Sequence, residues 1–211
     1  MQETHSIFKK TADWRNLRLY QKSDTLCQLT GVFCQRFLPA YGDRTVDQMT
    51  QAARSGKQNI VEGSEDGKTS TEMEIKLLNV ARASIGELRE DYEDYLKSHR
   101  LVQWDKRHPR FAALLEFCRQ NNEYDCYASM AEKLSAEEFC NMAITVCHFT
   151  DKMMVSYLEY LEKRFVTEGG IKERMHSART GYRQEQDARM AALEQENYRL
   201  KELLKQHGIE F

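Results

Sequence analysis

Two stretches decide the fold of this chain: VDQMTQAARSGKQNIVEG at residues 46–63 and LNVARASIGELREDYEDY at residues 78–95. In each stretch, small or apolar residues recur at alternating steps of three and four, which places them along one face of a helix. They are Val46, Met49, Ala53, Gly56 and Ile60 in the first stretch and Leu78, Ala81, Ile85, Leu88, Tyr92 and Tyr95 in the second. Such a stripe needs a helical partner to cover it, so the two stretches predict packed helices.

The pattern extends along the chain and predicts an all-α fold, an up-down antiparallel four-helix bundle. We expect a bundle domain over residues 1–167, with helices at about 12–38, 43–63, 70–97 and 135–167, a turn at 63–67 and a partly helical connector at 98–134. Pro39 ends the first helix because proline has no N–H to donate. Ser70 or Thr71 opens the third helix, and Ser135 and Glu138 have the spacing of a capping box that opens the fourth.

The composition changes after Gly169 and Gly170, which predicts a helix break and a C-terminal helical suffix over residues 168–211. The end of the suffix carries a seam at steps of three and four: Met190, Leu193, Asn197, Leu200 and Leu204. A polar residue at one such position fixes register or strand number, so the seam predicts self-association through a short coiled coil. The alternative is a single amphipathic helix that lies on the bundle.

Charge, apolar runs and cysteine spacing limit the ligands and the location that we expect for this chain. The net charge is −2, so any binding to nucleic acid must come from a local basic face. No apolar run approaches the roughly 20 residues that span a bilayer, and residues 1–14 have no signal-peptide pattern, so we expect a cytoplasmic protein with no membrane partner. The six cysteines contain no C-x-x-C pair and are expected to be free thiols in a reducing compartment.

Motifs for catalysis are weak. The run GSEDGKT at residues 63–69 has three residues, rather than four, between its first glycine and Gly-Lys, which excludes the phosphate-binding loop. The six histidines are scattered, and none follows a core-register glutamate by three residues, as a di-iron bundle would need. We therefore expect a protein that is not an enzyme and that holds no metal and no cofactor.

Two basic regions are candidates for binding nucleic acid. Lys172, His176, Arg179 and Arg183 recur at steps of four, three and four, which gives one basic helix face in the suffix. A second region near the N-terminus holds Lys9, Lys10, Arg15, Arg18 and Lys22, interleaved with the aromatic residues Phe8 and Trp14. Basic faces of this kind can contact phosphates. The alternative is a solvated helix whose charge is balanced by Glu173, Glu185 and Asp187.

Polar residues accompany the apolar stripes of residues 46–63 and 78–95. They are Arg54, Asn59, Glu62, Arg82, Ser84 and Glu87. A half-buried polar group without a hydrogen bond costs about 1–3 kcal/mol, so we expect these residues to bond to one another. Such a network either fixes the register of the helices or contacts a subunit or another partner.

The run QAARSGKQNIVEG at residues 51–63, followed by LLNVARASIGEL at residues 77–88, resembles the signature of a bacterial four-helix-bundle protein family, also known from intervening sequences of 23S ribosomal RNA genes. The matching residues are Asn59, Ile60, Glu62, Gly63, Ala81, Arg82, Ser84, Glu87 and Leu88. The extension from Gly169 resembles the branch of that family with a C-terminal suffix.

The resemblance implies an assembly. The family includes accessory proteins of diversity-generating retroelements, basic bundles that form pentamers and bind a reverse transcriptase and nucleic acid. It therefore implies a homo-oligomer, such as a pentamer, with RNA or DNA and a protein such as a reverse transcriptase as partners. We predict a non-enzymatic oligomeric adaptor that binds RNA or a ribonucleoprotein through basic helical surfaces. The alternative is a protein-interaction scaffold with no nucleic-acid role.

Overall fold

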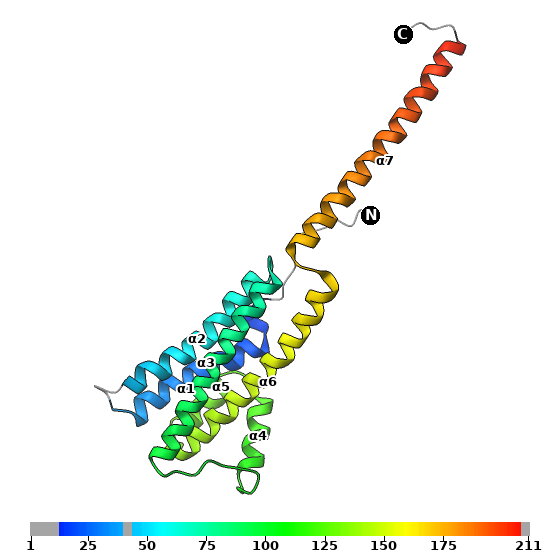
Figure 1. Cartoon of the computed structure of the whole chain (residues 1–211). Coiled ribbons are helices and arrows are strands. Elements are labelled where there is room, and N and C mark those ends of the chain that lie inside the picture. Colours follow the sequence, from blue (N-terminus) through cyan, green and yellow to red (C-terminus); the bar gives the residue numbers. More distant parts are fainter. Residues whose placement is uncertain (1–12, 40–43, 208–211) are drawn as a thin grey trace. The chain divides into compact units, whose positions relative to one another are not determined.

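The computed structural model describes residues 13–39 and 44–207, and it is helical, with no strand in these ranges (Figure 1). The prediction of an all-α fold is therefore confirmed. The elements are η1 (Trp14–Asn16), α1 (Arg18–Phe37), α2 (Arg44–Asp66), α3 (Thr71–Ser98), α4 (Phe111–Gln120), α5 (Asp125–Ala131), α6 (Ala136–Glu168) and α7 (Ile171–Gln206). No helix of the described ranges combines the length and apolar character needed to cross a membrane.

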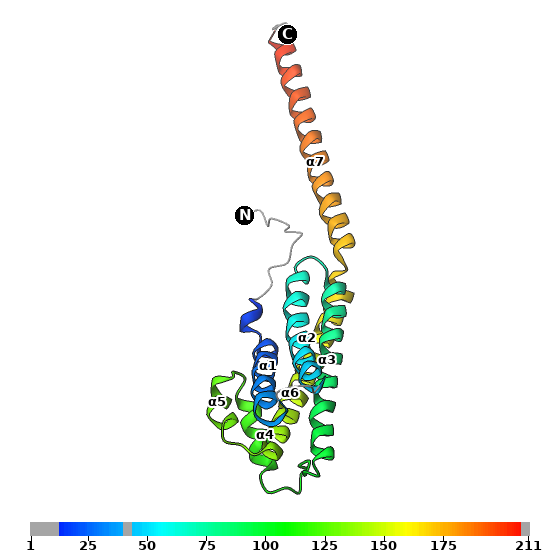
Figure 2. The ribbon, with the colours of Figure 1, turned by 90° about the vertical axis from the view of Figure 1, so that its left-hand side faces the viewer.

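The chain divides into two compact units, one over Phe8–Thr167 and one that contains Glu168–Phe211. In the larger unit the long helices α1, α2, α3 and α6 run alongside one another in both ribbon views, and the short α4 and α5 lie toward one end (Figures 1 and 2). The helix count therefore differs from the four helices of a plain bundle. The reason is that the connector has its own apolar residues, and Cys118, Tyr127 and Ala131 join the core of the long helices.

The stripes of the two fold-deciding stretches form the centre of the core. Their residues are at most 1% exposed at Met49, Ala53, Ile60, Leu78, Ala81, Ile85, Leu88 and Tyr92, whereas Val46 and Tyr95 are half-buried. Tyr92 packs edge-on against Phe33 of α1, with ring centroids 4.9 Å apart, and its hydroxyl lies 3.0 Å from the Thr30 hydroxyl. The helical spacing in the sequence therefore predicted the core correctly.

A glycine sets the distance between α2 and α3. A Cβ atom placed on Gly56 would lie 2.6 Å from Cδ1 and 3.0 Å from Cγ1 of Ile85, both closer than carbon atoms approach without a shift. At the neighbouring positions, the Ser55 and Ser84 hydroxyls are 3.0 Å apart and hydrogen-bond across the same interface. The two helices therefore approach closely only because residue 56 has no side chain.

Two helix boundaries differ from the prediction. The first helix does not begin near residue 12: Asp13 caps the short turn η1 by accepting from the Arg15 N–H, and Leu17 is extended, so α1 starts at Arg18. The second helix does not end at Gly63. It continues to Asp66, and Gly63 is buried within it. Gly63 packs closely against α3, since a Cβ added at Gly63 would lie 3.3 Å from Cβ of Leu77. Gly63 therefore serves packing, not a turn.

Three predicted helix ends are confirmed. Ser70 caps α3 by accepting from the Met73 N–H at 3.2 Å. The capping box at α6 is formed in both directions, because the Ser135 hydroxyl accepts from the Glu138 N–H at 3.3 Å and the Glu138 carboxylate accepts from the Ser135 N–H at 2.9 Å. The break lies at Gly169, whose φ of 70° is a conformation that glycine adopts readily.

We expect Gly56→Ala to lower the free energy of unfolding by about 1–3 kcal/mol relative to Gly86→Ala, since only the first overpacks a core contact. Both substitutions place alanine inside a helix and gain the same helix propensity, but a Cβ on Gly86 meets no atom within 4 Å. Denaturant unfolding of the two variants measures the difference. Equal stabilities would mean that Ile85 moves aside at no cost.

Candidate nucleic-acid interface

The basic stripe of the suffix lies on α7, a helix of 36 residues of which none is buried. Lys172, His176, Arg179 and Arg183 are all exposed. At 1.5 Å per residue, the stripe from Lys172 to Arg183 extends over about 16 Å of helix axis. Along this segment only Glu173 is acidic, so the first third of α7 presents a locally positive surface to solvent.

The predicted association seam lies on the second half of α7. Met190, Leu193 and Leu200 are 61%, 57% and 53% exposed, Asn197 is exposed and Leu204 is half-buried. An isolated helix gains little stability in water from its own hydrogen bonds, and packing of an apolar face supplies most of the stability of helices in proteins. Within its own unit, α7 therefore carries three exposed large apolar residues at seam positions, Met190, Leu193 and Leu200.

The second basic region does not form one patch. Lys9 and Lys10 lie outside the described residues. The Arg15 guanidinium lies 4.1 Å from the Trp14 ring centroid and 3.4 Å from an Asp13 carboxylate oxygen. Arg15 therefore forms a local ion pair and a cation–π contact. Arg18 is exposed at the start of α1. The prediction was wrong for Lys22, which is fully buried and offers no charge to a ligand.

Lys22 instead fastens the connector to α1. Its Nζ donates to the backbone carbonyls of Cys118 and Asn121, at the C-terminal end of α4, and lies 3.4 Å from the Tyr127 hydroxyl. A cation at a helix C-terminus is favourable because unpaired carbonyls gather there. Burial lowers the pKa of Lys22 from its ordinary 10.5 to about 8. A few residues along α1, the Thr25 hydroxyl donates to the Asn122 carbonyl at 2.7 Å.

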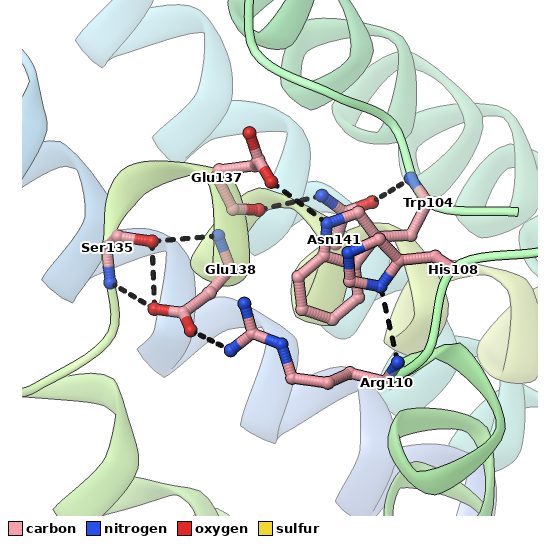
Figure 3. A network of polar contacts seen from close by, with 7 residues as sticks. All are labelled: Trp104, His108, Arg110, Ser135, Glu137, Glu138 and Asn141. Carbon is pink, nitrogen blue, oxygen red and sulfur yellow. Dashed lines mark hydrogen bonds and ion pairs between the residues drawn. The ribbon is translucent and has the colours of Figure 1, made fainter.

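A second anchor joins the start of the connector to α6 (Figure 3). The Asn141 side chain accepts from the Trp104 N–H at 2.7 Å and donates to the Val102 carbonyl at 2.9 Å. The Glu137 carboxylate accepts from the Val102 N–H at 3.0 Å and from the Trp104 indole N–H at 3.0 Å. These bonds lower the pKa of Glu137 and hold the extended segment before α4 in place.

The same anchor includes a stack of side chains over Trp104. The His108 ring lies parallel to the indole at a centroid distance of 4.0 Å, and the Arg110 guanidinium lies 4.8 Å from the indole centroid (Figure 3). Arg110 also pairs with Glu138 of the capping box. Since Trp104 is only 8% exposed, this cluster holds the connector and does not present an aromatic surface. Sequence reasoning missed it, because residues 102–110 have no periodic pattern.

The structure brings only some of the predicted polar residues together. The Asn59 side chain donates to the Ser55 hydroxyl at 3.2 Å, and Ser55 in turn contacts Ser84. Arg82 instead donates to Asp151 of α6 at 2.6 Å, and Glu62 accepts from Gln58 within α2 at 3.2 Å. Arg54 and Glu87 line two separate surface hollows. One part of the set therefore links α2 to α3, while the rest acts elsewhere.

Ligand chemistry is sparse in the described part of the chain. No group of three or more histidine, cysteine or acidic side chains there could hold a metal ion. Burial raises the pKa of the Cys118 thiol to about 11 and of the Cys140 thiol to about 12. Burial raises the pKa of Cys147 as well. These thiols stay protonated near neutral pH, so they are poor nucleophiles and poor metal ligands.

Comparisons with models of protein families, with curated proteins and with solved structures find no match to this chain. The chemistry of the exposed residues is therefore what indicates a function. The most distinctive of these are the basic stripe and the apolar seam of α7, since the polar contacts of the larger unit hold its own helices together.

We expect the contribution of Lys22 to stability to increase with pH. The pKa of Lys22 is about 8 in the folded chain and 10.5 in its ordinary state. Between these pH values the unfolded state binds more protons than the folded state. Unfolding therefore becomes less favourable as the pH rises from about 8 to 10.5. The unfolding free energy of the wild type minus that of Lys22→Met should rise by up to about 3 kcal/mol over this interval.

Denaturant unfolding at a series of pH values measures this rise. The matched control is Lys106→Met, because Lys106 is exposed on the connector and should show no such dependence. Parallel pH profiles for the wild type and Lys22→Met would contradict the lowered pKa.

Proposed function

We propose that this protein is a non-enzymatic, oligomeric helical adaptor that binds RNA, alone or within a ribonucleoprotein, through α7. One observation carries the proposal: α7 is 36 residues long and none of them is buried. A helix of this length and exposure is expected to be stabilised by partners. Its two halves have different chemistry, so the proposal assigns each half its own partner.

The apolar half associates with the same half of other copies of the chain. Leu193 and Leu200 fall on the same positions of successive heptads, and Asn197 between them limits the pairing to one register. The basic half then contacts phosphates, each contact releasing a counterion. Assembly places several basic stripes on one particle, so individually weak contacts add up through effective concentration.

The resemblance to the bacterial four-helix-bundle family supports the same proposal. In this view α1, α2, α3 and α6 are the antiparallel four-helix bundle of that family, α4 and α5 elaborate its connector, and α7 is its suffix. The family's accessory proteins form pentamers that bind a reverse transcriptase and nucleic acid, so a pentamer is the oligomer proposed. The free cysteines suit the reducing cytoplasm.

One observation favours a protein partner instead. A hollow of about 450 Å³ between α2 and α3 is lined by four carboxylates, those of Glu87, Glu90, Asp91 and Asp94. Burial, and then the neighbouring carboxylates, raise the pKa of Asp91. This surface repels phosphate and suits a basic protein. The second candidate function is therefore a scaffold for a protein partner with no nucleic-acid role.

We expect Leu193→Glu with Leu200→Glu to reduce the mass of the particle in solution, because charges at the seam cannot be buried between helices. The wild type should show a mass that is a multiple of 24.8 kDa by light scattering. The matched control is Ala191→Glu with Tyr198→Glu, which adds the same charges at exposed positions off the seam. A monomeric wild type, or a particle unchanged by the seam substitutions, would contradict assembly through α7.

We expect Arg179→Glu with Arg183→Glu to weaken RNA binding and to lower the slope of log affinity against log salt by about 0.7 for each lost contact. Lys106→Glu with Arg107→Glu reverses the same number of exposed charges on the connector and should bind as the wild type does. Titration of a labelled single-stranded RNA at several salt concentrations provides the measurement. If the wild type binds neither RNA nor DNA at about 50 mM salt, the scaffold function replaces the adaptor.

A further inference from the structure

A groove of about 550 Å³ lies along α1 and α6, separate from the acidic hollow. Its lining is largely apolar and aromatic and comes from the start of α1, the end of α4 and the middle of α6. The residues are Leu17, Arg18, Leu19, Arg119, Phe149, Lys152, Met153, Ser156, Tyr157 and Tyr160. The volume is within the range of sites that bind small organic groups, about 300–1,000 Å³.

Two tyrosines give the groove a flat aromatic surface. The Tyr157 hydroxyl donates to the Glu74 carboxylate of α3 at 2.7 Å, which fixes the orientation of its ring. The Tyr160 ring is nearly parallel to it, at an interplanar angle of 15° and a centroid distance of 6.0 Å, and Tyr160 is 54% exposed. Part of this aromatic surface is therefore open to a planar ligand.

The charged residues of the groove are all cationic. Arg18 comes from α1, Arg119 from α4 and Lys152 from α6. Arg119 is paired with Glu116 at 2.7 Å. Among the described residues no carboxylate lies within ion-pair distance of Arg18 or Lys152. The groove therefore combines an apolar aromatic floor with two cations that form no ion pair with the part of the chain that the structure describes, and its complement is an anion that carries a flat apolar group.

We propose that this groove is a second binding site for single-stranded nucleic acid, with one base on the exposed face of Tyr160 and neighbouring phosphates on Arg18 and Lys152. The inference rests on the proposed function, RNA binding, and adds a site in the larger unit to the stripe on α7. Stacked bases on aromatic side chains beside a basic groove are the usual chemistry of single-strand binding. A fatty acyl chain suits the groove less well, because it requires enclosure and Tyr160 is open to solvent.

Substitution of Tyr160 tests the stacking contact in the full-length chain. With a labelled oligouridine of about twelve nucleotides, Tyr160→Ala should weaken binding about tenfold, and Tyr160→Phe should bind as the wild type does because it keeps the ring. Tyr160→Leu keeps apolar area but not the flat face, so it should resemble Tyr160→Ala. A leucine variant that binds at wild-type strength would overturn base stacking. An oligothymidine should follow the same order, since neither stacking nor phosphate contact requires the 2′-hydroxyl.

The phosphate contacts are measured separately, through the salt dependence of the affinity. Arg18→Ala with Lys152→Ala should lower the slope of log affinity against log salt by about 1.4, which is two lost contacts on a single strand. The matched control, Lys106→Ala with Arg107→Ala, should leave the slope unchanged. Circular dichroism of each variant verifies that its helices are intact.

The two proposals fail in different ways. If the groove substitutions have no effect while Arg179→Glu with Arg183→Glu abolishes binding, the groove proposal is overturned and the function assigned to α7 stands. If the wild type binds no oligonucleotide at about 50 mM salt, the proposed function itself is overturned, and the groove proposal with it.

Discussion

The close approach of α2 and α3 is the constraint on which the rest of the larger unit depends. Gly56 lets the Ile85 side chain approach α2 more closely than a Cβ would permit, and Gly63 makes a tight but milder contact with Leu77 near the end of α2. Because these helices approach closely, Ser55 and Ser84 reach hydrogen-bonding distance. The facing helices add further large core side chains, such as Phe33 of α1 and Phe139 of α6, whose ring centroids lie 5.6 Å apart.

The connector between α3 and α6 is held by polar groups as well as by the apolar residues that join the core. At its start, Asn141 and Glu137 bind the backbone of an extended segment, and at its middle Lys22 binds the end of α4. Most buried polar groups in proteins are hydrogen-bonded in this way. The polar contacts fix both ends of the segment that carries α4, and the end of α4 and the middle of α6 line the groove.

The sequence alone predicts those features that depend on local spacing. Stripes of apolar residues, the Ser70 cap, the Ser135–Glu138 capping box and the Gly169 break are all determined by residues within a few positions of one another. The sequence predicts a turn at Gly63, because the role of this glycine in packing depends on α3, and a surface cation at Lys22, because its carbonyl partners are far along the chain.

The same distinction applies to the candidate sites. The stripe and the seam of α7 follow from spacing on one helix, and the structure leaves their residues largely exposed. The groove has no sequence signal, since its cations and tyrosines come from three helices and converge only after folding. Among these cations and tyrosines, the sequence identifies only Arg18, as one member of a basic region. Nothing in the sequence indicates that Lys152 and Tyr160 line the same groove.

Because Lys22 is buried, chemical labelling of its amine reports the separation of α1 from the connector. Its amine is enclosed by carbonyl and aromatic groups, so a reagent that acylates amines cannot reach it while α1 contacts the connector. Exposed lysines react at once, whereas Lys22 reacts only in molecules in which the connector has detached. The extent of labelling at this one side chain, followed over time by peptide mass, therefore counts the events, local or global, in which α1 separates from the connector.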